Sequence, residues 1–117
     1  MMTVSVLALL TTTLCDGIVA NMKAKLLLRS KEVLSDDAIL EMVIWQLPSP
    51  VPGSSHFYKY RLYFGKDGTR LVCFDNERPK GDHQHIDGEE TNYRFSDVEH
   101  LIEDFLNAVR KRRLQND

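Results

Sequence analysis

The sequence predicts an α+β fold, in which a mostly antiparallel sheet of four or five strands carries a C-terminal α-helix packed on one face. Two observations predict it: short apolar runs separated by turn residues fill residues 24–95, and one helical repeat follows them. The 117 residues are 43% hydrophobic and 27% charged, which suits one domain with a buried core. The net charge of −2 excludes a uniformly basic nucleic-acid binder.

Two apolar runs predict the first hairpin. Residues 24–34 and 39–47 have the composition of strands, and Ser35, Asp36 and Asp37 between them form a turn signal. The prolines at positions 48, 50 and 52 then predict a loop, because proline lacks an amide donor and fixes φ.

A second hairpin is predicted around Asp67 and Gly68, a pair that favours a two-residue loop between strands. Residues 56–64 and 69–74 would be its strands, with Phe64 opposite Leu71 and Leu62 opposite Cys73. The predicted core face is Tyr58, Tyr60, Leu62, Phe64, Leu71 and Cys73. The predicted opposite face is Phe57, Lys59, Arg61, Tyr63, Val72 and Phe74.

The last predicted elements are a short strand and a helix. Residues 83–86 predict the strand, and Gly88 permits a turn after it. Ser96 and Glu99 have the spacing of a capping box, which starts the helix. Apolar residues then recur at helical spacing and predict the buried stripe Val98, Leu101, Ile102, Phe105 and Val109. The basic run at 110–113 suits the negative end of the helix dipole, and we interpret it as solvated.

The densest polar segment contains His83 and His85, which on a strand would point the same way, about 7 Å apart. Imidazoles titrate near neutral pH, so one can accept the 2′-hydroxyl proton of RNA while the other donates to the leaving oxygen. Arg61 would stabilise charge on the phosphorane, and Asp75 or Asp82 would orient an imidazole. These five residues are the predicted catalytic set.

Aromatic and basic side chains alternate on the predicted strand at 56–64. This pattern suits single-stranded RNA, whose bases stack on rings and whose phosphates follow cations. The predicted RNA-binding residues are Lys59, Tyr63, Arg78 and Lys80.

Two other interpretations of the histidine pair stay open. His83 and His85 followed by Glu89 or Glu90 are similar to the first half of a cupin metal motif, which would suit iron, manganese or zinc. Against it, the chain is short for a jelly roll, and the later histidine would be His100 on the predicted helix. The other interpretation is an exposed, charge-balanced loop in which Asp and Asn form turns.

Several ordered blocks along residues 22–110 carry a resemblance. They are residues 23–29, 41–48, 52–56 and 60–62, Phe74-Asp75-Asn76-Glu77, Lys80-Gly81-Asp82-His83-x-His85 and Tyr93-x-Phe95. Together they resemble the TumE family of small prokaryotic toxin–antitoxin proteins. The resemblance implies the toxin half of a two-gene module, neutralised by a helix-turn-helix antitoxin. Where the family often has Arg between the two histidines, this chain has Gln84, which removes one phosphate contact.

Residues 1–21 contain one charged side chain, Asp16, and we interpret them as an N-terminal extension of a single toxin-like domain at 22–117. Met22 resembles a natural start; a signal peptide, or an added strand or helix, is the alternative. Cys15 and Cys73 are too few for a disulfide scaffold, which favours the cytoplasm.

The predicted function is a toxin that inhibits growth as a metal-independent ribonuclease acting on translational RNA, with no cofactor and no membrane association. Its partners would be RNA and the antitoxin, the latter in a complex with it. One alternative is a non-enzymatic module that binds RNA or protein. Another is a metal-dependent enzyme with a His-x-His site.

Overall fold

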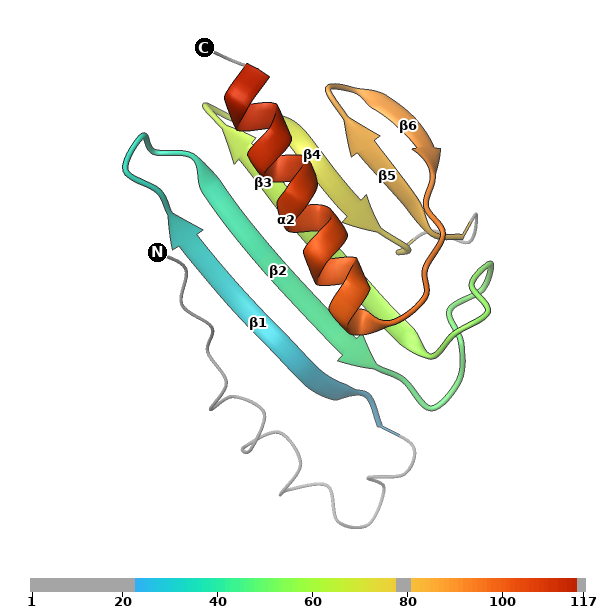
Figure 1. The fold of residues 1–117 in the computed structure, drawn as a ribbon. Coiled ribbons are helices and arrows are strands. Elements are labelled where there is room, and N and C mark those ends of the chain that lie inside the picture. Colours follow the sequence, from blue (N-terminus) through green and yellow to red (C-terminus); the bar gives the residue numbers. More distant parts are fainter. Residues whose placement is uncertain (1–22, 78–80, 116–117) are drawn as a thin grey trace.

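A computed structural model describes residues 23–77 and 81–115, which form a six-stranded antiparallel sheet and a helix (Figure 1). The strands lie side by side in chain order. The elements are β1 (Lys25–Val33), β2 (Ile39–Gln46), β3 (Tyr58–Lys66), β4 (Thr69–Asp75), β5 (His83–Ile86), β6 (Glu89–Asn92) and α2 (Val98–Gln115). The predictions for residues 1–21, Arg78 and Lys80 fall outside the described residues.

The predicted α+β class with a C-terminal helix is confirmed, but the sheet has six strands rather than four or five. The strand missed by sequence reasoning is β6, whose four residues are all polar and exposed, so it has no apolar alternation. It forms because Asp87 and Gly88, with φ of 52° and 86°, make a two-residue turn that returns the chain along β5.

Helix α2 covers one face of the sheet (Figure 1) and buries Leu101, Phe105 and Val109, which belong to the predicted stripe. Phe105 meets Phe74 of β4 edge-on, with ring centroids 5.7 Å apart. Burying each such side chain stabilises the fold by roughly 1.5–3 kcal/mol. Within the described residues, no helix is both long and apolar enough to cross a membrane.

The residue that caps α2 is Asp97 rather than the predicted Ser96. Oδ1 of Asp97 accepts a hydrogen bond from the amide of His100 at 2.7 Å, and its carbonyl accepts from Leu101 at 3.0 Å. Asp and Ser are equally good caps, so the sequence pattern alone did not separate the two neighbouring positions.

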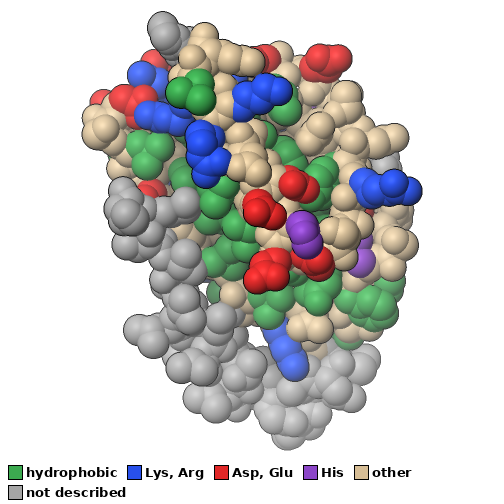
Figure 2. All heavy atoms as spheres, viewed as in Figure 1, with side chains coloured by type: hydrophobic (Ala, Val, Ile, Leu, Met, Phe, Trp, Pro, Cys, Tyr) green, Lys and Arg blue, Asp and Glu red, His purple; other side chains and the backbone are tan. Residues whose placement is uncertain are grey.

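Charges along α2 are segregated. Figure 2, which views the helix side, shows Lys and Arg gathered near the C-terminal end of α2 and acids nearer its start, as the helix dipole favours. The basic end, predicted to be solvated, is partly paired: Arg112 contacts Asp87 at 2.8 Å and Arg113 contacts Asp36 at 3.3 Å. These ion pairs tie the helix to the turns of two hairpins.

The loop between β3 and β4 has two residues as predicted, because Lys66 pairs with Thr69 across Asp67 and Gly68. The predicted pairing beyond it is wrong. A β-bulge at Phe64 and Gly65 shifts the register by one residue, so Phe64 lies opposite Val72 rather than Leu71.

This shift exchanges the faces of β4 from Val72 onward, since a slip of one residue turns the following side chains over. Leu71, the unpaired residue of the bulge, still packs against the core as predicted. Val72 and Phe74 enter the core beside α2, together with the correctly predicted Tyr60, Leu62 and Phe64. Cys73 was predicted to share that core face. It lies instead opposite Tyr63, and Asp75 lies opposite Arg61.

Glycine at position 65 is required by the bulge. A β-carbon there would lie 2.7 Å from the carbonyl oxygen of Thr69 and would also overlap the Tyr63 ring. Because the Thr69 oxygen is backbone, it cannot move without opening the turn. The bulge therefore depends on a residue without a side chain.

Candidate functional site

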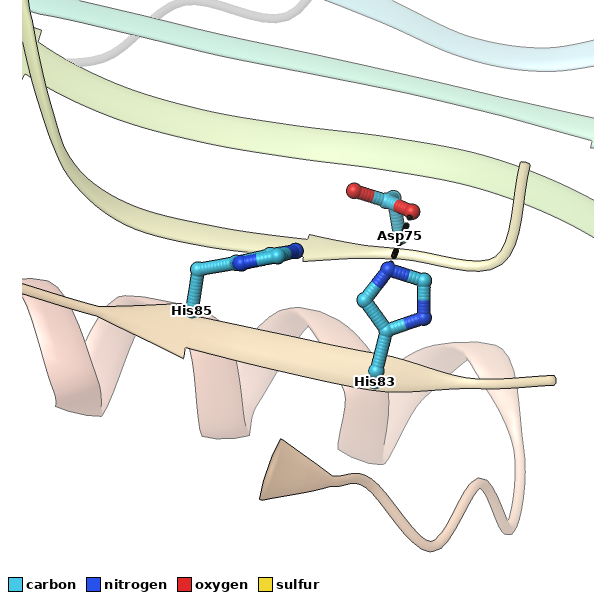
Figure 3. A group of neighbouring side chains, drawn as sticks. All are labelled: Asp75, His83 and His85. Atoms are coloured by element: carbon cyan, nitrogen blue, oxygen red, sulfur yellow. Dashed lines mark ion pairs between the residues drawn. The ribbon is translucent and has the colours of Figure 1, made fainter. Parts of the chain in front are cut away.

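The two histidines of β5 lie on the sheet face opposite α2, which we call the site face. Figure 3 shows His83 and His85 projecting from β5 toward Asp75 on β4, with the helix behind them. Asp75 pairs with His83, and Cys73 pairs with His85. The imidazole rings meet edge-to-face with centroids 4.9 Å apart, so strand spacing brings both to one place.

His83 is held through both ring nitrogens. Its Nε2 lies 3.0 Å from Oδ1 of Asp75, and its Nδ1 lies 2.8 Å from the carbonyl oxygen of Gly81. A carbonyl only accepts hydrogen bonds, so Nδ1 carries a proton. The ring is 3% exposed. His83 is thus a fixed, buried group whose Nε2 faces a carboxylate.

Asp75 is itself fixed by further contacts. Its Oδ1 accepts from the Glu77 amide at 3.3 Å, and its Oδ2 lies 3.5 Å from the thiol of Cys73. Burial, followed by the charge of Asp75, raises the pKa of the Cys73 thiol to about 12. Cys73 is therefore a neutral thiol at physiological pH and not a nucleophile.

His85 lies closer to the solvent than His83. Nη2 of Arg70 is 3.3 Å from its Nδ1, and because a guanidinium only donates, Nδ1 is the acceptor. Burial first, and then the charge of Arg70, lower the pKa of His85. The ring is consequently neutral at neutral pH, with a lone pair on Nδ1, which is the protonation state that a general base needs.

These side chains line a pocket of about 320 Å³. The lining residues are Arg61, Arg70, Asp75, Glu77, His83, His85 and Glu90. Arg61 enters from β3, opposite Asp75, and its guanidinium lies 5.0 Å from the centre of the Tyr63 ring. The pocket thus combines two imidazoles, two guanidiniums and three carboxylates.

Sequence reasoning missed Arg70 and Glu77. Arg70 is one of several exposed cations on predicted strands, and nothing beside it in the sequence distinguishes it. Its position follows from the pairing of β4 with β5, which brings it to His85. Glu77 reaches the pocket from the residues just after β4.

Asp82, predicted as an alternative orienter, is placed elsewhere. Its carboxylate accepts from the hydroxyl of Ser54 at 2.6 Å and of Tyr60 at 2.7 Å, and it lies 2.6 Å from Nε2 of His56. Tyr60 belongs to the core on the α2 side of the sheet, and Phe95 stacks on His56 with centroids 3.7 Å apart. Asp82 therefore lies on the face opposite that of the histidine pair.

We call this second cluster the Asp82 network; it consists of Ser54, His56, Tyr60, Asn76 and Asp82. Nδ1 of His56 accepts from the backbone amide of Tyr58 at 3.1 Å, so its proton is on Nε2 and points at Asp82. The buried Asn76 bonds the Tyr60 amide at 3.0 Å and donates to Ser54 at 3.1 Å. Burial, followed by the bond to Asp82, raises the pKa of Tyr60.

The predicted RNA-binding residues divide into two groups. Lys59 and Tyr63 lie on β3 at alternate positions with Arg61, so all three share the site face. Arg78 and Lys80 lie outside the described residues.

The pocket also contains a set of possible metal ligands. Asp75, His83 and His85 each offer one ligand atom, and these atoms all lie within 4.8 Å of one another. The bond from His83 Nδ1 to a carbonyl is typical of the support that metal-bound histidines receive. The carboxylate nearest the pair is Asp75, whereas Glu89 or Glu90 was predicted, because pairing of β4 with β5 brings Asp75 beside His83.

Comparison with known proteins gave one match. A family model described as Toxin TumE matches residues 23–113, which include all six strands and most of α2. No curated protein and no solved structure matches the chain. The matched span contains the pocket residues and the Asp82 network.

Proposed function

This chain belongs to the TumE toxin family, and from that premise we propose that it inhibits growth by cleaving RNA in the pocket around His85. The observation that carries the proposal is the pairing of a neutral imidazole with two guanidiniums in one pocket. Phosphodiester cleavage needs a base for the nucleophile and positive charge for the phosphorane, and this pocket offers both.

The proposed reaction is a transesterification within the RNA chain. Nδ1 of His85 takes the proton from a 2′-hydroxyl, and the 2′ oxygen forms a bond to the adjacent phosphorus. The bond from phosphorus to the 5′ oxygen breaks, and that oxygen takes a proton from Nε2 of His83, whose N–H exchanges its bond to Oδ1 of Asp75, 3.0 Å away, for one to the leaving oxygen. The products are a 2′,3′-cyclic phosphate and a 5′-hydroxyl end.

Arg70 and Arg61 would hold the reacting phosphate. In the free protein Arg70 occupies the lone pair of His85 Nδ1 at 3.3 Å. A phosphate binds a guanidinium more strongly than a neutral ring does, because the hydrogen bond is charge-assisted on both sides. Phosphate binding would therefore draw Arg70 away and leave Nδ1 free to accept the 2′-hydroxyl proton.

Asp75 would orient the acid. Its Oδ1 lies 3.0 Å from Nε2 of His83, and the Gly81 carbonyl accepts from Nδ1, so the two contacts fix the orientation of the ring. The geometry favours Asp75 over Asp82 in this role, since Asp82 contacts neither histidine of the pair.

An antitoxin is the partner that membership of this toxin family suggests. We propose further that the antitoxin is a helix-turn-helix protein that forms a complex with the toxin in the cytoplasm. The proposed target is translational RNA.

The test is cleavage of a labelled RNA by the purified protein in excess EDTA. We expect the parent to cleave and a His83→Ala/His85→Ala variant to lose about a hundredfold or more of the rate. His100→Gln is the matched control, since it alters an exposed histidine on α2 that contacts Asp97. Undiminished cleavage and toxicity of the double variant would disprove the mechanism, and RNA binding without cleavage by the parent would indicate a non-enzymatic module.

A metal-dependent enzyme is the second candidate, favoured by the ligand geometry of Asp75, His83 and His85. Such a site would need the ligand atoms to draw closer, since bonds of about 2.0–2.2 Å to zinc place ligands closer together than 4.8 Å. The two arginines of the pocket would oppose a cation. Cleavage that EDTA abolishes and zinc or manganese restores would favour this candidate over the acid–base mechanism.

A further inference from the structure

The register of the sheet arranges the site face into two rows that cross the strands. One row runs Arg29, Val43, Arg61, Asp75, His83 from β1 to β5. The next runs Lys31, Glu41, Tyr63, Cys73, His85. Each row therefore begins at a cation on β1 and ends at one of the two histidines, about 19 Å away at the usual spacing of strands.

The cations at the start of these rows are available to a ligand. Arg29, Lys31 and Lys59 are exposed and form no ion pair within residues 23–77 and 81–115. By contrast, three cations near the hairpin turns, Lys66, Arg112 and Arg113, are each paired with an aspartate. Among the described residues, a group of cations without an ion-pair partner thus lies on the site face between β1 and β3, while Arg110 and Lys111 form a second such group on α2, away from the pocket.

Two aromatic side chains lie among these cations. Trp45 of β2 is half-buried and pairs with Lys59, while Tyr63 is half-buried beneath the guanidinium of Arg61. Rings on a sheet face can stack only on bases that are not already stacked and paired in a duplex. The surface is therefore suited to a single strand rather than to a double helix.

Carboxylates line the pocket at β6 and just after β4. Glu90 on β6 and Glu77 after β4 line the pocket. A polyanion that reaches His85 would be repelled by Glu90 on the β6 side. On the β1 side it would be attracted by Arg29, Lys31 and Lys59, which outnumber Glu41, the acid that lies opposite Lys31 in the second row. The charge distribution therefore gives the ligand a direction of approach.

We propose that a single-stranded RNA crosses the site face from β1 to β5, which rests on and extends the proposed ribonuclease function. Arg29, Lys31 and Lys59 bind phosphates outside the pocket, and Trp45 and Tyr63 stack bases. The phosphate to be cleaved enters between Arg61 and Arg70. Arg29, Lys31 and Trp45 are thus binding residues that contribute to affinity and not to the chemical step.

The test separates binding from cleavage. Two proteins are compared, both carrying His85→Asn to prevent cleavage: the otherwise unchanged parent and the Arg29→Gln/Lys31→Gln variant, which we call the β1 variant. Fluorescence anisotropy measures their affinity for a labelled RNA of about 12 nucleotides at several salt concentrations. We expect affinity to fall about tenfold and the salt slope to fall by about 1.4, because two phosphate contacts are lost. The matched control is Arg110→Gln/Lys111→Gln, which removes the same charge from α2 and should bind like the parent.

A second experiment keeps His85 intact and measures the rate at which the parent and the β1 variant cleave a dinucleotide and the longer RNA. The β1 variant should cleave the dinucleotide at the parental rate and the longer RNA with a raised KM. Equal loss in the α2 control, unchanged binding in the β1 variant, or equal affinity for duplex RNA would overturn the proposal. A β1 variant that loses binding to the antitoxin but keeps binding to RNA would also overturn the proposal, because it would show that this surface binds protein. If the parent cleaves no RNA, the ribonuclease proposal fails, while the binding arm still tests the path.

Discussion

Two histidine–carboxylate clusters lie at the same end of the sheet, one on each face. On the site face, His83 faces Asp75 at 3.0 Å inside a pocket of about 320 Å³ that two arginines share. On the α2 face, His56 faces Asp82 at 2.6 Å in a network that also binds Ser54 and Tyr60. A short contact between histidine and aspartate is common to both, so it does not by itself indicate catalysis.

The difference lies in what remains unoccupied. Asp82 accepts from three donors, and His56 uses one nitrogen for Asp82 and the other for the Tyr58 amide. In the pocket, Nδ1 of His85 accepts one long hydrogen bond, from the exposed guanidinium of Arg70 at 3.3 Å, and lies 3.9 Å from a carboxylate oxygen of Glu90. The first arrangement stabilises a loop, while the second can exchange partners with a ligand.

The largest expected effect is on catalysis at His85. His85→Asn should lower RNA cleavage by about 10²–10⁴-fold, since it removes the general base, and should leave the melting temperature nearly unchanged. His56→Asn should lower the melting temperature and leave cleavage nearly unchanged, because it breaks the partly buried Asp82 network. Cleavage rates and melting temperatures of both variants test this prediction. Equal losses of activity in the two variants, at the same melting temperature, would show that the two clusters do not differ in function.

The next effect is on stability at Asp82. Asp82→Ala should lower the free energy of unfolding by about 3 kcal/mol, because it leaves three partly buried donors, those of Ser54, His56 and Tyr60, without their acceptor. Asp75→Asn should cost less stability and more activity, since it keeps the shape of the side chain but loses the charge facing His83. Urea unfolding measures the first quantity. A more stable Asp82→Ala protein would show that the network is not structural.

A smaller effect is expected at the bulge. Gly65→Ala should destabilise the protein by about 1–3 kcal/mol, because the added β-carbon overlaps the Thr69 carbonyl. Since the bulge turns Asp75 to the site face, a partial loss of the register should also lower the cleavage rate by more than the fraction of protein that unfolds. Denaturant unfolding together with cleavage rates tests this. Gly68→Ala is the comparison for backbone strain without overlap, because a β-carbon there meets nothing within 4 Å while its φ of 77° disfavours alanine. It should lower stability without the additional loss of activity.

The smallest effect is on pH dependence. Because the pKa of His85 is lowered in the folded protein, the base form persists below pH 6.5, and the acid limb of kcat/KM should lie below that value. The same shift means that the unfolded chain binds the proton more readily. The free energy of unfolding should therefore decrease as pH falls through 6.5 toward the lower pKa of His85 in the folded protein. Arg70→Gln should raise the acid limb toward 6.5, and an unchanged profile would count against the Arg70 contact.

Local signals predicted much of the fold. The loop at Asp67 and Gly68, the buried stripe of α2 and the strand that carries His83 and His85 all follow from short-range chemistry. The strand β6 had no such signal, because its residues are polar on both sides. To predict β6, the pair Asp87 and Gly88 would have to be interpreted as a two-residue hairpin loop rather than only as the end of β5.

The sequence by itself determined that two imidazoles share one face of a strand, because side chains at alternate positions of a strand point the same way. It did not determine which carboxylate accompanies them. Asp75 and Asp82 are equally plausible from spacing, and only the bulge at Phe64 and Gly65 turns Asp75 to the site face. Tertiary structure also placed Arg70 beside His85, since contacts between strands depend on register, and register is settled by packing over the whole sheet.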